Sequence, residues 1–279
     1  MPLKGLLAGK SAIITGGTTG IGRAICLGFL KQGAHVVVNH LGLPKDQPHL
    51  DSLIAEAETL YQQDPENVGR LAHEKGDVRD PETATSLVTR AVQHHAAILG
   101  GGKQGRLDIC VSNAGICTFA DFLSLSPDLL NTTIRTNLDG AFYITQAAAR
   151  QMALHQQPSG GSIIGVSSIS ALVGGGLQTH YTPTKAGVTS LMQSTAVALG
   201  KHGIRCNALL PGTIRTQLNE EDLKDDDKRT YMEGRIPLGR TGDPSDMAGP
   251  AVFLACEELS GYVTGAQLLV DGGLFVNLQ

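Results

Sequence analysis

Tryptophan is absent from this 279-residue chain, and aromatic residues together make up only 4% of it. The core must therefore be built from aliphatic side chains. Charged residues are also scarce, at 17% against a typical value of about 25%. Because disorder requires high charge and low hydrophobicity, a chain with 41% hydrophobic residues is not expected to be disordered over most of its length.

Three further absences limit the expected classes of function. No apolar run approaches the roughly 18 residues that span a bilayer, and the first residues lack the apolar segment of a secretory signal. No basic stripe accompanies the formal charge of −4, so neither a membrane nor nucleic acid is an expected partner. The five cysteines are odd in number and never in CxxC spacing, which predicts free thiols in a cytoplasmic protein.

A metal site is not expected either. The neighbouring His94 and His95 lie in an expected helix and face different directions, with no histidine or carboxylate four residues further on. Glycine, by contrast, is abundant, at 35 of 279 residues. Such a chain turns tightly and is suited to a ligand that requires close approach of the backbone.

Short apolar runs alternate with helical patterns from one end to the other. The expected strands are Ser11–Thr15, Ala34–Asn39, Gly69–Glu74, Leu107–Ser112, Ser162–Ser167, Arg205–Leu210 and Gln267–Asp271. The expected helices are Gly22–Lys31, Pro81–Ala97, Pro127–His155, Pro183–His202 and Pro244–Ala255, several of which begin at proline. This alternation predicts one doubly wound α/β domain over residues 1–279, with a parallel sheet covered by helices on both faces.

Two segments, Leu43–Asn67 and Gly100–Gly105, interrupt the alternation. Leu43–Asn67 is polar and contains one helical patch, Ser52–Tyr61, so it is expected to be a surface excursion. A further segment, about 214–235, includes the charged run Glu220–Arg229 (EEDLKDDDKR) and follows a strand end and a Pro-Gly turn. A solvated helical face and a lid over the substrate are both open interpretations, because ligands of α/β proteins bind where strands end.

A glycine-rich turn, Thr15–Gly22 (TGGTTGIG), separates the first expected strand from the first helix. Gly16 permits a tight turn, Gly20 lets the backbone approach a pyrophosphate, and Gly22 lets the helix pack on the strand. The N-terminus of that helix presents free N–H groups to the anion. An ordinary tight turn is the alternative, but this position in the chain favours dinucleotide binding. Thr18, Thr19 and Ile21 share the turn and are expected to contact the same ligand.

A second cluster combines Ser168, Tyr181 and Lys185. Tyr181 and Lys185 are four residues apart and share one face of an expected helix. A tyrosine is a poor base at neutral pH unless a cation stabilises its phenolate, and Lys185 is placed to be that cation. Ser168 ends a strand and can hydrogen-bond a substrate oxygen at the same place. A packing contact between Tyr181 and Lys185 is the alternative.

These motifs occur together with Asn113-Ala114-Gly115 after the fourth strand, Asn137 in the following helix and Pro211-Gly212 after the sixth strand. In this order and spacing they span nearly the whole chain, and the sequence is identified as a member of the short-chain dehydrogenase/reductase family. The resemblance implies a single Rossmann-like domain with a seven-stranded parallel sheet and a bound nicotinamide nucleotide. It also implies a catalytic tetrad of Asn137, Ser168, Tyr181 and Lys185.

The resemblance further assigns roles to individual residues. Tyr181 would be the acid/base, Lys185 would lower its pKa and hold the nicotinamide ribose, and Asn137 would support a proton relay through water. Ser168, Ser170 and Tyr181 would contact the substrate. Along the cofactor, Asp77 and Val78 would flank the adenine, Asn113, Ala114 and Gly115 would line the cleft beside Pro211 and Gly212, and Ile214 and Thr216 would contact the nicotinamide amide.

Several longer segments are similar to the subfamily of fungal L-rhamnose 1-dehydrogenases. They include QTHYTPTKAG, YMEGRIPLGR and the tail GAQLLVDGGLFVNLQ, which contain ordinary surface positions. The resemblance implies oxidation of the C1 hydroxyl of a sugar to the lactone. A dehydrogenase for another sugar or polyol, a 3-oxoacyl-thioester reductase and a catalytically silent nucleotide-binding regulator are the alternatives. Cys117 is expected to be a small apolar filler, with a place in the substrate pocket as the alternative.

Two expectations concern the cofactor and the assembly. The second strand ends at Asn39 and His40 rather than at the carboxylate typical of NAD sites, which predicts weak discrimination, and the resemblance favours NAD, with NADP as the alternative. Arg23 follows Gly22 directly, but its helical position is expected to aim it elsewhere. The helix after Tyr181 carries a stripe of small residues, Ala186, Ser190, Ser194 and Ala198. The stripe packs either on the protein's own sheet or, as the family resemblance implies, between subunits of a homotetramer.

Overall fold

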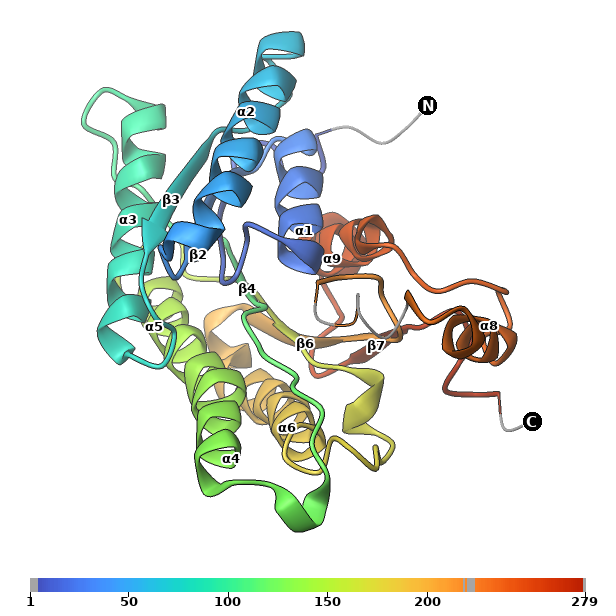
Figure 1. The fold of residues 1–279 in the computed structure, drawn as a ribbon. Coiled ribbons are helices and arrows are strands. Elements are labelled where there is room, and N and C mark those ends of the chain that lie inside the picture. The colour runs from blue at the N-terminus through green and yellow to red at the C-terminus, as the bar shows by residue number, and fades with distance from the viewer. Residues whose placement is uncertain (1–4, 218, 220–223, 278–279) are drawn as a thin grey trace.

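Seven short strands form one parallel sheet in the order β3-β2-β1-β4-β5-β6-β7 (Figure 1). The computed structural model describes residues 5–217, 219 and 224–277. The strands are β1 (Ser11–Ile14), β2 (His35–His40), β3 (Leu71–Lys75), β4 (Ile109–Ser112), β5 (Gly161–Val166), β6 (Ile204–Pro211) and β7 (Gln267–Val270). The predicted seven-stranded parallel sheet is thus confirmed.

Helices cover both faces of this sheet, as expected. The helices of the described residues are α1 (Gly20–Lys31), α2 (Gln47–Gln63), α3 (Pro81–Leu99), α4 (Pro127–Ile134), α5 (Gly140–Leu154), α6 (Thr182–Leu199), α8 (Asp226–Gly234), α9 (Ala248–Ala255) and α10 (Glu257–Ser260). One apolar core joins α1, α2 and α9 to one face, and a second joins α3, α5 and α6 to the other. Val37 of β2 belongs to the second core and its neighbours Val36 and Val38 to the first, because successive side chains of a strand point to opposite faces.

Helix starts follow the signals in the sequence. The side chain of Asp80 accepts a hydrogen bond from the backbone of Glu82 and Pro81 opens α3, while Ser126 caps α4 in the same way ahead of Pro127. Each cap satisfies one of the N–H groups that a helix leaves without an internal partner. Proline suits the position that follows because it has no N–H to satisfy.

Two segments differ from the sequence-based expectation. The helix expected over Pro127–His155 is divided by a π-helical turn, Arg135–Asp139, which carries Asn137. The helical patch expected over Ser52–Tyr61 is the middle of the longer helix α2, whose Leu50, Leu53 and Ala57 are buried. The turns at both ends of that patch are polar, so hydrophobic periodicity alone did not reveal them. The lid segment expected over about 214–235 includes 218 and 220–223, which lie outside the described residues.

The strand order fixes where a ligand can bind. From β1 the chain adds β2 and β3 on one side, and then returns to place β4 on the other side of β1. In open α/β sheets, ligands bind in the crevice at the carboxyl ends of the strands on either side of such a switch point. No helix among the described residues is both long and apolar enough to span a bilayer.

Candidate active site

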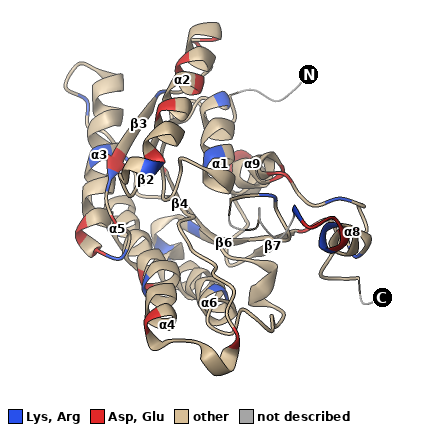
Figure 2. Cartoon of the chain, viewed as in Figure 1, with Lys and Arg blue, Asp and Glu red and all other residues tan. Residues whose placement is uncertain are grey.

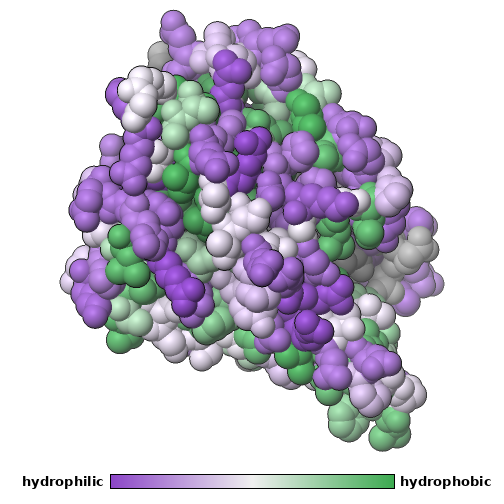
Figure 3. Space-filling view, turned by 90° about the vertical axis from the view of Figure 1, so that its left-hand side faces the viewer, coloured by the Kyte–Doolittle hydropathy of each residue, from purple (hydrophilic) through white to green (hydrophobic). Residues whose placement is uncertain are grey.

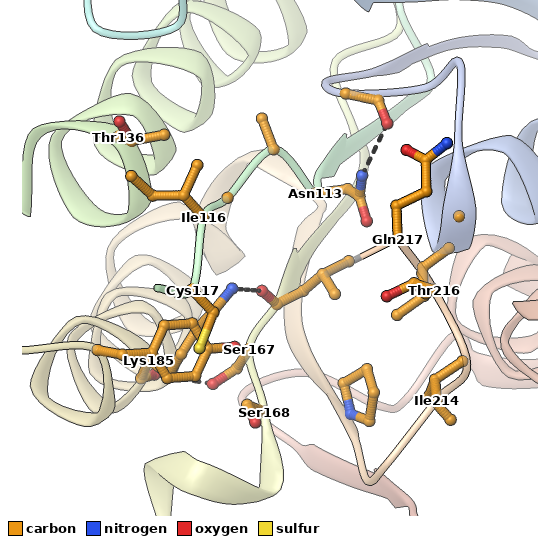
Figure 4. Close-up of a pocket in the computed structure, with 18 of the residues that line it drawn as sticks. Asn113, Ile116, Cys117, Thr136, Ser167, Ser168, Lys185, Ile214, Thr216 and Gln217 are labelled. Carbon is orange, nitrogen blue, oxygen red and sulfur yellow. Dashed lines mark hydrogen bonds between the residues drawn. The ribbon is translucent and has the colours of Figure 1, made fainter. Parts of the chain in front are cut away.

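A cleft of about 700 Å³ opens at the carboxyl ends of the strands, between the first turn and α6 (Figure 4). All but three of the residues that the sequence places at the site line this cleft. The exceptions are Thr18, Gly22 and Asn137. Segments more than 160 residues apart in the sequence are therefore brought to one place by the parallel sheet.

The first turn has the backbone that the glycine pattern predicts. Gly16 has φ of 62° and Gly20 has φ of 52°, a region that side chains with a Cβ rarely adopt. The amide of Asn113 fixes the turn, because its Nδ2 donates to the carbonyl oxygens of Thr15 at 2.9 Å and Gly16 at 3.1 Å. The glycine turn and the segment after β4 therefore form one rigid unit beneath the cleft.

Gly22 and Thr18, two of the three predicted site residues that do not line the cleft, pack against this turn on the side away from the cleft. A Cβ on Gly22 would lie 2.2 Å from the carbonyl oxygen of Gly16, so only glycine lets α1 pack this closely. Thr18 is 7% exposed and is buried beside the turn rather than facing the cleft. Gly22 thus has the packing function expected from the motif, but neither residue lines the ligand space.

Ser168, Tyr181 and Lys185 meet at the other end of the cleft. Ser168 lies two residues after β5; its Oγ accepts a hydrogen bond from the backbone of Ser170 at 3.0 Å, and its hydroxyl donates to Tyr181. Lys185 lies on α6 with its Nζ 5.6 Å from the centre of the Tyr181 ring, and it donates to the carbonyl oxygen of Val166 at 3.0 Å. The structure thus brings the three side chains together as the sequence predicts.

Burial dominates the electrostatics of this cluster. It raises the pKa of Tyr181 above its ordinary value, with the nearby Cys117 thiol adding to the rise and the hydrogen bond from Ser168 opposing it. Burial also lowers the pKa of Lys185 to about 8. The lowering of the tyrosine pKa by Lys185 that the resemblance implies stays a prediction; the Lys185 ammonium lies over the tyrosine ring and donates to Val166.

Asn137 does not line the cleft, but its side chain supports the cleft wall through hydrogen bonds. Its Oδ1 accepts a hydrogen bond from the backbone N–H of Ile116 at 2.8 Å, and its Nδ2 donates to the carbonyl oxygen of Ile116 and to Thr184. Both amide hydrogens are therefore used within the protein. The side chain holds the segment after β4 against the helix that begins with Tyr181, and the π-helical turn around it is a feature often found at functional sites.

The opposite end of the cleft is formed where β2 and β3 end. Asn39 is 2% exposed, and its Nδ2 donates to the carbonyl oxygen of Gly76 at 2.9 Å. Asp77 and Arg79 form an ion pair at the edge, and the guanidinium holds the pKa of the Asp77 carboxyl below its ordinary value. Arg23 points away from the cleft, as expected, and binds Glu56 and Ser52 of α2.

Comparisons with known proteins agree with this geometry. A family described as enoyl-(acyl carrier protein) reductase matches residues 16–275. A solved structure of a putative short-chain alcohol dehydrogenase from Sinorhizobium meliloti superposes with a TM-score of 0.85 at 31% identity, covering 98% of each chain. The chain belongs to the short-chain dehydrogenase/reductase family.

Individual relatives narrow the resemblance. An L-rhamnose-1-dehydrogenase from Scheffersomyces stipitis is 57% identical over 277 residues, which cover 99% of this chain and 100% of that protein. An L-rhamnose 1-dehydrogenase (NAD(P)(+)) from a Sphingomonas species is 54% identical, covering 98% of this chain and 99% of the relative. Both the family and the similarity to L-rhamnose 1-dehydrogenases, inferred from motifs, are confirmed.

The cleft of this short-chain dehydrogenase/reductase fits a nicotinamide dinucleotide. Thr19 precedes α1 without making a side-chain cap, so the first N–H groups of the helix receive no hydrogen bond from it and face an anion site. A Cβ on Gly20 would lie 3.3 Å from the side chain of Thr216. The space between these two residues therefore suits glycine at position 20 better than a residue with a side chain. Among the described residues no group of three potential metal ligands is found.

Sequence reasoning missed part of the wall beside Tyr181. Gln178 donates from Nε2 to the Cys117 sulfur at 3.2 Å, and Phe119 and Met232 also line the cleft. Cys117 therefore has the place in the pocket that was the weaker of its two interpretations. Its position two residues after Gly115 of the Asn113-Ala114-Gly115 motif was the available signal, whereas nothing in the sequence marks Gln178 or Met232.

Proposed function

We propose that the protein oxidises the anomeric C1 hydroxyl of L-rhamnose, or of a related aldose, to the lactone with NAD(P)+. The observation that carries the proposal is the meeting of Ser168, Tyr181 and Lys185 at one end of a cleft that fits a dinucleotide. The names of the relatives at 57% and 54% identity support the choice of sugar.

In this proposal the protein removes a proton and orients two reactants. A nicotinamide nucleotide, when bound, supplies the acceptor for the hydride from C1. The phenolate oxygen of Tyr181 takes the proton of the C1 hydroxyl, while the hydroxyl of Ser168 donates to the same substrate oxygen in place of Tyr181 and fixes its position. Asn137 contributes by holding the cleft wall, and its support of a proton relay remains a prediction.

The two pKa shifts explain why Tyr181 and Lys185 must act together. Burial disfavours the phenolate and the ammonium separately, which raises one pKa and lowers the other. A phenolate beside an ammonium offsets part of that cost by mutual attraction, so the charged pair is the form in which Tyr181 can act as a base. Lys185 supplies this attraction across the tyrosine ring rather than through a hydrogen bond to the oxygen.

NAD is the proposed cofactor, with NADP as the alternative. Asn39 stands where a carboxylate would repel a 2′-phosphate, so the two kcat/KM values are expected to lie within about 100-fold of each other. Asn39→Asp is expected to raise the preference for NAD, chiefly by weakening NADP. The names of two similar relatives include NAD(P)(+).

A substrate screen tests the proposed activity. Free aldohexoses and 6-deoxyhexoses are offered with NAD+ and with NADP+, and the gain of absorbance by the reduced nicotinamide is followed. L-rhamnose is expected to give the highest kcat/KM. Reduction of a 3-oxoacyl thioester without oxidation of any sugar would contradict the proposal, and binding of cofactor without turnover of either class would indicate the catalytically silent alternative.

The proposed assembly is a homotetramer with two-fold interfaces. Ala186, Ser190, Ser194 and Ala198 are all exposed on α6, whereas the opposite face of this helix packs on the sheet. Packing on the protein's own sheet therefore does not account for the small-residue stripe. Val197 beside it is 88% exposed, which supports close contact with another subunit.

A second apolar region supports the same assembly. Phe122 and Leu123 precede α4 and are 66% and 93% exposed. Apolar side chains gather at the protruding lower end of the molecule in Figure 3, the level at which this segment lies in Figure 1. A monomer mass by light scattering at micromolar concentration would contradict the tetramer.

A further inference from the structure

A pair of histidines lies at the adenosine end of the cleft. His40 is the last residue of β2 and lines the cleft, and its Nε2 lies 3.2 Å from Nδ1 of His73 on the neighbouring strand β3. The ring centroids are 5.3 Å apart. Both side chains point to the same face of the sheet, because His73 is in register with Val38, two residues before His40.

Neither of the other polar groups at this end brings an uncompensated positive charge. Asn39 is buried and donates to Gly76. Arg79 is the guanidinium that lines this part of the cleft, and it is already paired with Asp77. A phosphate here would therefore meet an amide already bonded to the backbone and a neutralised cation. His40 is the group beside them that can gain a positive charge.

We propose that the His40–His73 pair selects between NADP and NAD according to its protonation, by binding a 2′-phosphate only after taking up a proton. The inference rests on the cofactor part of the proposed function, not on the identity of the sugar. It assigns cofactor choice to a titratable pair rather than to Asn39 alone.

The number of N–H groups on the two imidazole rings supports this selection. A neutral pair has two N–H groups, of which one lies in the bridge between the rings and one on an outer nitrogen. A singly protonated pair has an N–H on both outer nitrogens as well as in the bridge. Protonation therefore ensures that Nδ1 of His40 is a donor, and it adds the positive charge that a phosphate requires.

The surroundings of His40 favour its neutral form before a phosphate arrives. Burial, then the neighbouring His73, lowers the pKa of His40, and Lys75 of β3 lowers it further. Asp46 before α2 and Glu74 of β3 oppose this. Charges of both signs surround the ends of β2 and β3 in Figure 2. A 2′-phosphate adds negative charge at this place, so its binding and the uptake of a proton favour each other.

Binding measurements on the free protein test the inference without any turnover. Because the chain has no tryptophan, the fluorescence of NADH and NADPH reports their binding directly. Between pH 8 and pH 6.5 the ratio of the NADH Kd to the NADPH Kd is expected to rise about 3- to 30-fold, the range that uptake of about 0.3 to 1 proton gives over this interval. Below about pH 6 the phosphate itself takes a proton and the rise should end.

Calorimetry counts the proton independently. Titrations at pH 7 in two buffers with different ionisation enthalpies should show uptake of about 0.3 to 1 proton with NADP+ and almost none with NAD+, since only the former presents a phosphate to the pair.

Two variants separate this role from a structural one. His40→Gln should remove both the proton uptake and the pH dependence of the ratio. His73→Gln changes an exposed residue on the edge strand and keeps a hydrogen-bonding group beside His40. Because it removes the ring that lowers the pKa of His40, it should keep the pH dependence but move it to higher pH. The exposed His155→Gln is the matched control and should behave as wild type.

The outcomes distinguish this inference from the function on which it rests. A ratio that stays constant from pH 8 to pH 6.5 in wild type, with no proton uptake, overturns the inference and leaves the proposed function intact. Failure of both NADH and NADPH to bind at any pH instead overturns the cofactor part of the proposed function. A His73→Gln variant whose pH dependence is unmoved would show that His40 acts without its partner, which also contradicts the pair.

Discussion

Polar residues have different roles on the side of the sheet where its parallel strands begin, the amino edge, and on the side where they end, the carboxyl edge. At the amino edge, the Asp108 carboxylate accepts hydrogen bonds from the backbone of Ser11 and from Arg106, and His95 accepts one from the backbone of Arg106. At the carboxyl edge, the hydroxyls of Ser168 and Tyr181 both face a cleft, where a ligand can reach them. Polar groups whose partners are internal stabilise the fold, and those with unused capacity are available to a ligand.

Strand β2 has one histidine bonded within the protein and another that lines the cleft, both within six residues. It begins at His35, whose Nδ1 accepts from the backbone N–H of Arg70, and it ends at His40, which lines the cleft. The difference arises from position rather than from residue type. Because all seven strands run in parallel, every carboxyl end meets on one side, and changes there should alter function while changes at the amino edge should alter stability.

The largest expected effect comes from Tyr181→Phe at the carboxyl edge. Loss of the phenolic oxygen removes the acid/base, and kcat with the best sugar substrate should fall about 10³-fold or more. The ring itself remains, so the Kd for NADH should stay within about threefold of wild type. Steady-state kinetics and a fluorescence titration measure the two quantities. Retention of wild-type turnover would exclude Tyr181 as the base.

Gly22→Ala tests the rigid unit beneath the cleft. The new Cβ would lie 2.2 Å from the carbonyl oxygen of Gly16, a backbone atom that cannot move without disturbing the turn. We expect the free energy of unfolding to fall by about 1–3 kcal/mol and the affinity for NADH to fall as well. Urea denaturation and fluorescence titration are the measurements.

Gly249→Ala provides the matched control in another helix. No atom lies within 4 Å of a Cβ at Gly249, so alanine should raise the free energy of unfolding by about 0.4–1 kcal/mol. Equal behaviour of the two variants would show that the contact of Gly22 with Gly16 is not what restricts that position to glycine.

Asp108→Asn is the corresponding change at the amino edge. Asp108 is 5% exposed, and its carboxylate bonds Arg106 at 2.6 Å and Ser11 at 3.0 Å, so an amide would lose charge-assisted bonds. The free energy of unfolding should fall by about 1.5–3 kcal/mol, with kcat/KM unchanged within about twofold. Asp226→Asn, which removes an exposed ion pair with Arg229, should cost less than about 0.5 kcal/mol. A fall in kcat/KM with unchanged stability would contradict the division between the edges.

Functional residues at the carboxyl edge could be predicted from the sequence more fully than stabilising contacts at the amino edge. Motifs predicted the sheet, the glycine turn and the Ser168–Tyr181–Lys185 cluster, because these depend on local spacing along strands and helices. The structure was needed for contacts between distant segments, such as Gln178 with Cys117, His40 with His73 and Asp108 with Ser11. The amino-edge contact of Asp108 with Ser11 joins two residues that belong to no recognised motif, so the sequence alone does not indicate it.

The smallest expected effect is the response of stability to pH through His35. Burial, then the neighbouring His95, lowers the pKa of His35 to about 4 in the folded protein. Between pH 6.5 and pH 4 the unfolded chain therefore holds a proton at this residue that the folded chain does not. The folded state has its full stability above pH 6.5 and loses stability as the pH falls toward 4, by about 1–2 kcal/mol after allowance for the partial exposure of the ring.

His35→Asn isolates this contribution. The variant keeps a polar group beside the backbone N–H of Arg70 but cannot take up a proton, so it should lose less stability than wild type between pH 7.5 and pH 5. Urea denaturation at both pH values measures the loss, with His155→Asn as an exposed control that should follow wild type. The same loss in wild type and in His35→Asn would assign the acid sensitivity to other residues. A smaller loss in the variant, with sugar oxidation unchanged at pH 7.5, would place the first histidine of β2 in stability alone and leave the last, His40, to the cleft.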